Sequence, residues 1–209
     1  MKPVKTLIYS ILAGACIALG GTVFLMVDNN ILGSLFFTIG LFTICTFGFN
    51  LYTGKVCYAL ENKADYILTL VLIWFGNLLG TMIIALLEKF TRAGSKLFEN
   101  AQALADVKLN DSMISLFILG IFCNVCIYIA VDGFKNNPHE LGKYLSLFFG
   151  VMVFIICGFE HSVADMYYIS MAGAWSGHAV LSIIVISLGN AVGGLAIPVC
   201  KKLAEKNKD

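Results

Sequence analysis

The sequence predicts an all-α membrane protein of six transmembrane helices, built as an inverted 3+3 repeat with broken second and fifth helices. The chain of 209 residues is 59% hydrophobic and only 13% charged, whereas about a quarter of a soluble domain is charged. Six apolar stretches are long enough to cross a bilayer, which takes about 20 mostly apolar residues. Two corresponding stretches are interrupted by polar residues and glycine, a pattern that indicates a solute site between the halves of a membrane chain.

The six predicted spans follow one another along most of the chain. They cover residues 7–27, 31–60, 65–88, 112–132, 141–170 and 175–200. The first resembles the apolar part of a signal peptide, but it is too long and lacks an Ala-x-Ala cleavage site, so we expect it to remain as a helix. The second and fifth are too long for one helix, which predicts two half-helices joined by irregular backbone. Such backbone is tolerated at membrane depth only where protein buries it or where it lines a cavity.

The whole chain, residues 1–209, is expected to form a single transmembrane domain of two halves, approximately 1–90 and 110–200. Each half holds three spans, an odd number, so the second half enters the membrane from the opposite face. The loop between the halves is expected to form a short amphipathic surface helix. A Gly-Asn-x-x-Gly motif lies in the last span of each half, and its glycines are expected to let neighbouring helices approach closely.

Basic residues are distributed unequally between the two sides of the predicted topology. Ten of the fourteen lie on the side of the termini, with Lys55 counted there, and the other four lie in the 88–111 loop. An excess of Lys and Arg marks the cytoplasmic side. We therefore expect a multi-pass protein of the cytoplasmic membrane with both termini in the cytoplasm.

No cofactor, metal or nucleic-acid partner is expected from the sequence. The seven cysteines fall almost entirely within predicted helices, and Cys123-x-x-Cys126 has no second pair or nearby histidine to make a zinc or redox motif. There is no Walker A sequence and no Gly-x-Gly-x-x-Gly after a strand. ATP-driven transport within this chain is therefore not expected, and the lipid bilayer is the predicted surrounding.

His161 is the histidine predicted to lie at mid-membrane, since His139 and His178 fall in or near turns. An ionisable residue at this depth is costly and by default indicates function. A neutral imidazole can donate a hydrogen bond or a proton to an anion, and an imidazolium supplies positive charge. The alternative is a buried neutral ring that bonds a carbonyl group across helices. The place of His161 on one predicted break, opposite another, favours a pore.

The neighbours of His161 allow more than one role. Glu160 can support the loop by accepting backbone N–H groups or can hold the other nitrogen of the histidine. We favour loop support, because a carboxylate facing an anion path would repel the anion. Asp165 lies four residues beyond the histidine. In the other break, the Thr53 hydroxyl can both donate and accept, and half-helix N-termini there and after Ser162 would favour anions.

Polar and basic residues elsewhere complete the candidate site. Asn77, Asn124 and Asn190 lie inside predicted spans, where each either bridges helices or orients a pore residue. Lys5 and Lys108 each precede the first span of their half. Inverted symmetry would place one lysine near each mouth, where they would attract anions from both sides. Ordinary lysines at the membrane interface are the alternative.

Together these motifs resemble the formate/nitrite transporter family, from the first span to the last. The resemblance is carried by Gly158-Phe159-Glu160-His161-Ser162-Val163-Ala164-Asp165-Met166, Leu51-Tyr52-Thr53, Cys123-Asn124 and Gly189-Asn190-x-x-Gly193-Gly194. It implies an aquaporin-like fold in a homopentamer, with a separate anion pore in each protomer.

The resemblance also implies roles for individual residues. His161 corresponds to the central pore histidine and Thr53 to its neighbour on the facing loop, while Lys108 corresponds to a vestibule lysine. Other implied pore residues are the loop residues Leu51 and Tyr52, the apolar-ring residues Phe37, Leu41, Phe154 and Ile127, and the pore-proximal Asn124 and Asn190.

Two positions depart from the usual pattern of formate channels. Tyr52 stands where those channels usually have Phe, and Asp165 where they usually have Asn. The Leu-Tyr-Thr-Gly-Lys loop is more similar to the bacterial branch that conducts hydrosulfide. We therefore expect a channel for small monovalent anions in a bacterial inner membrane, with hydrosulfide as the main substrate and formate and nitrite as further ones.

Three alternatives remain at this point. One is a formate or nitrite transporter proper. Another is an aquaporin-like facilitator for water or glycerol, which would give no reason for a mid-membrane histidine and usually shows paired Asn-Pro-Ala loops that this chain lacks. The last is a membrane enzyme with His161 and Glu160 as acid and base. Because no metal set or second His or Asp cluster accompanies these two residues, we do not expect an enzyme.

Overall fold

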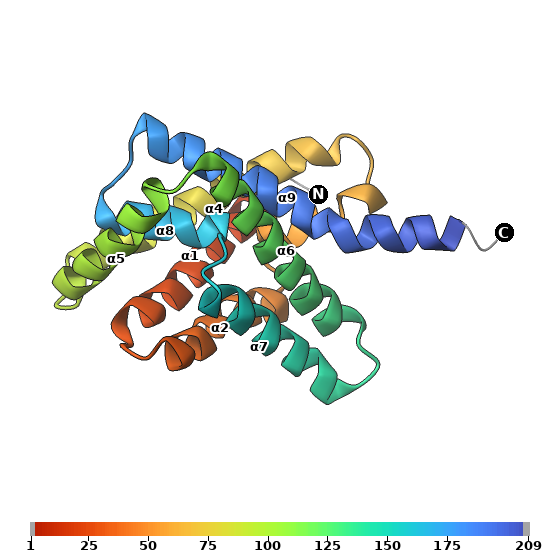
Figure 1. Cartoon of the computed structure of the whole chain (residues 1–209), viewed down its shortest axis with the longest axis horizontal. Helices are drawn as coiled ribbons and strands as arrows, with labels where there is room; N and C mark the ends of the chain where they lie inside the picture. The colour runs from red at the N-terminus through yellow and green to blue at the C-terminus, as the bar shows by residue number, and fades with distance from the viewer. Residues whose placement is uncertain (1–2, 207–209) are drawn as a thin grey trace.

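The computed structural model describes residues 3–206 as an assembly of helices. The sequence predicts that both ends of the chain lie in the cytoplasm. These ends lie partly outside the described residues. The longer helices are α1 (Pro3–Met26), α2 (Asn30–Phe47), α4 (Tyr66–Lys89), α6 (Met113–Asn136), α7 (Glu140–Ile156) and α9 (Gly177–Lys206). The shorter ones are α3 (Tyr52–Val56), the 3₁₀ turn η1 (Ala59–Glu61), α5 (Gly94–Leu109) and α8 (Ser162–Ala172). Figure 1 shows the last turns of α9 extending beyond the bundle.

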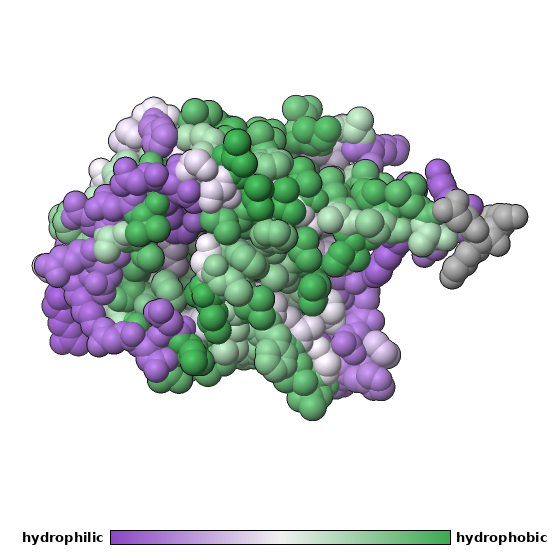
Figure 2. All heavy atoms as spheres, viewed as in Figure 1, coloured by the Kyte–Doolittle hydropathy of each residue, from purple (hydrophilic) through white to green (hydrophobic). Residues whose placement is uncertain are grey.

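Five of these helices are long and apolar enough to cross a membrane: α1, α2, α4, α6 and α9. Many of their large apolar side chains are exposed, as expected where lipid rather than water surrounds the protein. Figure 2 shows hydrophilic residues gathered towards two opposite ends of the molecule, with a hydrophobic surface between them. The helix α7 has 17 residues and is shorter than these five. The predicted sixth crossing therefore stays a prediction.

The backbone has the same conformation directly after α2 and directly after α7. Gly48 and Gly158 have φ angles of 69° and 66°, in the left-handed region that glycine adopts without penalty. The next residue, Phe49 or Phe159, donates its N–H to a carbonyl oxygen in the last turn of the helix it follows. Four residues after each glycine, a short helix begins: α3 in the first half and α8 in the second.

Glycines of the Gly-Asn-x-x-Gly motifs allow close helix packing, as the sequence predicted. A Cβ on Gly80 would lie 2.1 Å from the carbonyl oxygen of Ile11, and one on Gly193 would lie 2.0 Å from that of Ile121. Atoms cannot approach so closely, so only glycine fits at these two positions. The motifs thereby join α4 to α1 and α9 to α6, one pair in each half of the chain.

Every residue of the helix α8 is buried. It contacts α1, α4, α5 and α9. The helix α5, predicted as an amphipathic surface helix between the halves, packs on it with one face, through Leu97, Ala101 and Ala105. In Figure 1 α5 lies at the edge of the bundle, and Figure 2 shows hydrophilic residues over that region.

Candidate functional site

His161 precedes α8 and is 2% exposed. Its Nδ1 accepts a hydrogen bond of 3.1 Å from the backbone N–H of Ala164. An N–H group can only donate, so Nδ1 carries no proton, and in the neutral ring the proton lies on Nε2. Nε2 lies 2.9 Å from Oγ1 of Thr53. The local cap of α8 thus fixes both the tautomer and the direction of the imidazole, and the Nε2–H group donates to Thr53.

Thr53 lies in α3 and is completely buried. Its carbonyl oxygen accepts hydrogen bonds from Nδ2 of Asn124 at 3.0 Å and from the thiol of Cys57 at 3.2 Å. Since its Oγ1 accepts from His161, the hydroxyl hydrogen is left to donate to a third group. None of the described residues accepts that hydrogen. The pair therefore presents one donor that the protein itself does not use.

Asn124, which is bound to the carbonyl oxygen of Thr53, adds a buried acceptor. Its Nδ2 is bound to Thr53, whereas its Oδ1 is buried and has no hydrogen-bond partner among the described residues. A buried polar atom without a partner costs free energy comparable to a lost hydrogen bond. Such an atom is a candidate contact for a passing solute.

The apolar side chains that were predicted to narrow a pore pack near His161 or lie in the same buried apolar cluster. The ring of Phe154 stacks on the imidazole of His161, with centroids 5.5 Å apart and planes at 19°. Phe37 meets Phe154 edge to face at 6.0 Å. The remaining three, Leu41, Leu51 and Ile127, are each at most 2% exposed and belong to the same buried apolar cluster.

Asn190 fixes the loop that carries His161. Its Nδ2 donates to the carbonyl oxygens of Gly120 and Glu160, both at 2.8 Å, and its Oδ1 accepts from the N–H of Ser162 at 3.0 Å. These bonds join α9, α6 and the segment before α8. Irregular backbone in this segment is therefore satisfied by a side chain rather than by water.

Lys108, Glu160 and Asp165 form a buried ionic cluster at the start of α8. The Lys108 Nζ lies 2.5 Å from Oε2 of Glu160 and 2.9 Å from Oδ1 of Asp165, and its side chain is only 14% exposed. Burial opposes the charge on the ammonium, but the two carboxylates outweigh this effect and raise the pKa of Lys108 above its usual value. The Glu160 carboxylate thus binds Lys108 and not the ring of His161. The charge of Lys108, predicted for a vestibule, is compensated within the protein.

Two of the predicted residues lie away from the Thr53–His161 pair. The Lys5 side chain is exposed, with Nζ 5.2 Å from the centre of the Tyr9 ring. The Tyr52 hydroxyl donates to the carbonyl oxygen of Ser187 at 3.0 Å. The Tyr52 side chain is therefore bound to α9, although its backbone lies beside Thr53.

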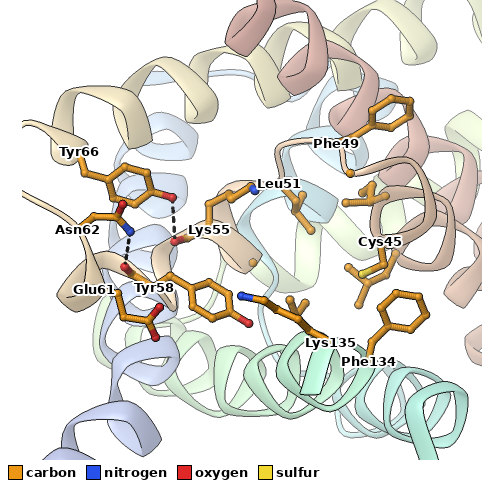
Figure 3. A pocket seen from close by; sticks show the side chains of 15 residues that line it. Cys45, Phe49, Leu51, Lys55, Tyr58, Glu61, Asn62, Tyr66, Phe134 and Lys135 are labelled. Carbon is orange, nitrogen blue, oxygen red and sulfur yellow. Dashed lines mark hydrogen bonds between the residues drawn. The ribbon is translucent and has the colours of Figure 1, made fainter. Parts of the chain in front are cut away.

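A cavity of about 530 Å³ lies between α2, α3 and α6. Its walls include Leu41 and Leu51, and Figure 3 shows Lys55, Tyr58 and Lys135 around the same space. The sequence predicts no role for Tyr58, and it marks Lys55 and Lys135 only as basic residues on the side of the termini. Lys55 and Lys135 are far apart in the sequence, so no motif joins them. Their basic character on the same side of the predicted topology was the one available signal.

Membrane-crossing helices that enclose a buried hydrogen-bond donor and an unpartnered acceptor, among apolar rings, define a multi-pass membrane transport protein. The similarity of the chain to known proteins supports this class. The chain matches the family model described as "Formate/nitrite transporter" over residues 1–202. The chain belongs to this family, as the resemblance predicted. Because the family is made up of channels and transporters, the enzyme alternative is excluded.

Individual relatives span nearly the same length. The chain is 27% identical to a probable formate transporter of Methanothermobacter thermautotrophicus, with 94% of this chain and 86% of the relative covered. It is 30% identical to the uncharacterized transporter YrhG of Bacillus subtilis, with 93% and 84% covered. A solved pentameric formate channel with formate bound superimposes with a TM-score of 0.83 at 24% identity, covering 99% of this chain and 98% of that one. The likeness in structure establishes the fold.

Proposed function

We propose that this protein is a channel for small monovalent anions, formate among them. The observation that carries the proposal is the Thr53–His161 pair, whose 2.9 Å contact leaves the Thr53 hydroxyl hydrogen free at a buried site. An anion that enters an apolar region loses its hydration, at a cost of several kcal/mol or more. A hydrogen-bond donor at this buried position offsets a share of that cost only for a solute that can accept the bond.

The proposed path begins at the cavity beside Lys55 and Lys135. An anion drawn into this cavity passes Leu41 and Leu51 and reaches the Thr53 hydroxyl. His161, the other member of the pair, keeps its Nε2 proton on the Thr53 oxygen, because a neutral imidazole that lost it would become an anion, and the bound solute takes its proton from the water of the cavity. A weak acid then crosses the second apolar ring as a neutral molecule, for which Asn124 Oδ1 offers an acceptor.

The proposed topology is six crossings in an aquaporin-like inverted repeat, with halves at about 1–90 and 110–200. In it, α2 with α3 and α7 with α8 are each one interrupted span. The matching exits at Gly48 and Gly158 and the matching close contacts at Gly80 and Gly193 support this proposal. The excess of basic residues on the side of the termini supports their place in the cytoplasm. The proposed location is the cytoplasmic membrane of a bacterium.

We propose a homopentamer as the working assembly. The similar solved structure is described as pentameric, and a subunit of such an assembly needs apolar faces for its neighbours as well as for lipid. Large side chains such as Phe36, Phe75 and Leu86 are more than half exposed on α2 and α4. Those faces are available for lipid or for other protomers.

Hydrosulfide as the preferred substrate is a second candidate. It rests on the Leu51–Lys55 loop, which is similar to that of the hydrosulfide-conducting branch and places Tyr52 where formate channels usually have Phe. The relatives described above that are named for a substrate are named for formate. Their names favour formate, so the order of preference must be measured directly.

The deciding experiment is flux of hydrosulfide, formate, nitrite and glycerol into proteoliposomes, between about pH 5 and pH 8. The intact chain and His161→Ala are compared. We expect anion flux with little glycerol flux, and a loss of both selectivity and pH dependence in the variant. Glycerol flux without anion flux would instead support the aquaporin-like alternative. The fastest anion decides between formate and hydrosulfide.

A further inference from the structure

The cavity beside α3 is much larger than the proposed substrates require. Its volume is about 530 Å³, whereas one water molecule takes about 30 Å³ of the liquid, and formate has only three heavy atoms. Apolar residues such as Leu41, Leu51 and Phe134 form part of its wall. The cavity therefore has room for a larger solute. The apolar part of its wall forms no hydrogen bonds with bound water.

Two lysines give this cavity a positive charge, and Asp132, one turn before Lys135 on α6, contacts Asn136 and Lys201 instead of either of them. Within residues 3–206, neither Lys55 nor Lys135 forms an ion pair. Figure 3 shows the Lys55 side chain extending towards Leu51 and that of Lys135 lying beside Tyr58. The one carboxylate in the lining belongs to Glu61, which is exposed. Lys108, by contrast, is held between two carboxylates.

Tyr58 adds a hydrogen-bond donor to these two charges. Its ring lies under the Lys135 ammonium, with Nζ 4.8 Å from the ring centre. Its hydroxyl oxygen is buried and has no hydrogen-bond partner among the described residues. A buried hydroxyl without a partner is unfavourable, so a ligand that accepts from it is stabilised. Two ammonium groups and one free hydroxyl together match the oxygens of a doubly charged anion.

We propose that the cavity is a binding site for a small dianionic oxyanion, held by Lys55, Lys135 and the Tyr58 hydroxyl, and that the bound dianion blocks the path of monovalent anions. The free energy of transferring an ion into an apolar region rises with the square of its charge. A dianion at Lys55 therefore stops at Leu41 and Leu51, where a monovalent anion passes. The blocking effect rests on the proposed function, whereas the binding does not.

Binding is tested by titration calorimetry of the purified full chain with sodium sulfate, with sodium chloride at equal ionic strength as the comparison. We expect sulfate binding that weakens by about tenfold in Lys55→Met and in Lys135→Met, and by less in Tyr58→Phe. Lys55→Arg keeps the charge and should keep the binding. Lys202→Met, which removes an exposed lysine of α9 outside the cavity, is the matched control and should bind as the intact chain does. Equal binding by the intact chain and the Lys55→Met/Lys135→Met double variant would overturn the proposal.

Blocking is tested by adding sulfate to one side of a planar bilayer that contains the channel. Sulfate should reduce the formate current only when it is added on the cavity side. The Lys55→Met/Lys135→Met double variant should conduct the same formate current with sulfate as it does without. Equal inhibition from both sides, or sulfate current through the channel, would contradict the block. Sulfate binding at Lys55 and Lys135 without any monovalent anion current would support the site and refute the proposed function.

Discussion

Asn77 and Asn190 make the same set of three hydrogen bonds in the two halves of the chain. The Asn77 Nδ2 donates to the carbonyl oxygen of Ser10 at 2.8 Å and to that of Asn50 at 2.9 Å. Its Oδ1 accepts from the N–H of Tyr52 at 2.8 Å. One amide therefore satisfies three backbone groups around the break between α2 and α3.

The second half repeats this arrangement group for group. Asn190 contacts the carbonyl oxygens of Gly120 and Glu160 and the N–H of Ser162. Each of these three residues lies 110 positions after its counterpart in the first half. Because Asn77, Asn190 and the backbone breaks that they contact are buried, the two asparagines replace hydrogen bonds that a continuous helix would make itself.

Replacing either asparagine by leucine should destabilise the protein strongly. Asn190→Leu removes three buried hydrogen bonds, two of them to the irregular backbone of Glu160 and Ser162, and we expect a loss of roughly 3 kcal/mol or more in the free energy of unfolding. Asn77→Leu should cause a similar loss. Unfolding in detergent, followed by circular dichroism, measures both. Asn136→Leu, which removes an exposed side chain bound to Asp132, should change little. Equal stability of all three variants would contradict this account.

Much of the fold could be predicted, because the length of an apolar stretch and the spacing of its glycines can be read within a short segment of the sequence. Stretches of about 20 apolar residues located the long helices, and the Gly-Asn-x-x-Gly motifs located close helix contacts at Gly80 and Gly193. The family resemblance paired Thr53 with His161, and the structure places their side chains 2.9 Å apart. The pore roles implied for these two residues stay predictions.

Contacts between residues that lie far apart in the sequence could not be predicted. Lys108 precedes its span in the sequence as an interfacial lysine would, yet it lies between Glu160, in the segment before α8, and Asp165, in the first turn of α8. Its burial follows from the packing of α5 on α8, for which no local pattern exists. The cavity between Lys55 and Lys135 likewise depends on where α3 meets α6.

Gly193→Ala should destabilise the contact between α6 and α9. The added Cβ would lie 2.0 Å from the carbonyl oxygen of Ile121, so one helix must move, at an expected cost of about 1–3 kcal/mol. Gly177→Ala, at the start of the same helix, adds a methyl group with nothing within 4 Å. Thermal unfolding should separate the two variants. A Gly193→Ala protein as stable as Gly177→Ala would show that this packing tolerates a side chain.

Lys108→Met should be among the most damaging single substitutions, because it leaves the buried carboxylates of Glu160 and Asp165 without their cation. Breaking a buried ionic group in this way costs roughly 3–5 kcal/mol. Lys96→Met is the matched control on α5, since its ion pair with Asp28 is exposed, at 46% and 92% for the two side chains. Such a surface pair is worth about 0–1 kcal/mol. Similar unfolding curves for the two variants would refute the structural role of the cluster.

The stability due to Lys108 should depend on pH in one direction only. Its pKa is raised in the folded protein by Asp165 and Glu160, against the effect of burial. The stabilisation is therefore complete below the pKa of an unfolded lysine, about 10.4, and is lost as pH rises through the higher folded value. Thermal unfolding of the intact chain should lose more stability above about pH 10 than that of Lys108→Met. Parallel pH profiles would contradict this prediction.

Thr53→Val tests the donor at the centre of the proposed pore. Valine keeps the shape of threonine but removes the hydroxyl that accepts from His161 and is left free to donate. We expect anion flux to fall by about tenfold, as the loss of one hydrogen bond to a charged solute predicts. The free energy of unfolding should fall by about 1–3 kcal/mol, because the buried Nε2–H of His161 loses its acceptor. Thr53→Ser keeps the hydroxyl and should retain most of the flux. If valine and serine variants conduct formate equally well, the hydroxyl does not contact the anion, and the Nε2–H of His161 must then meet the anion without it.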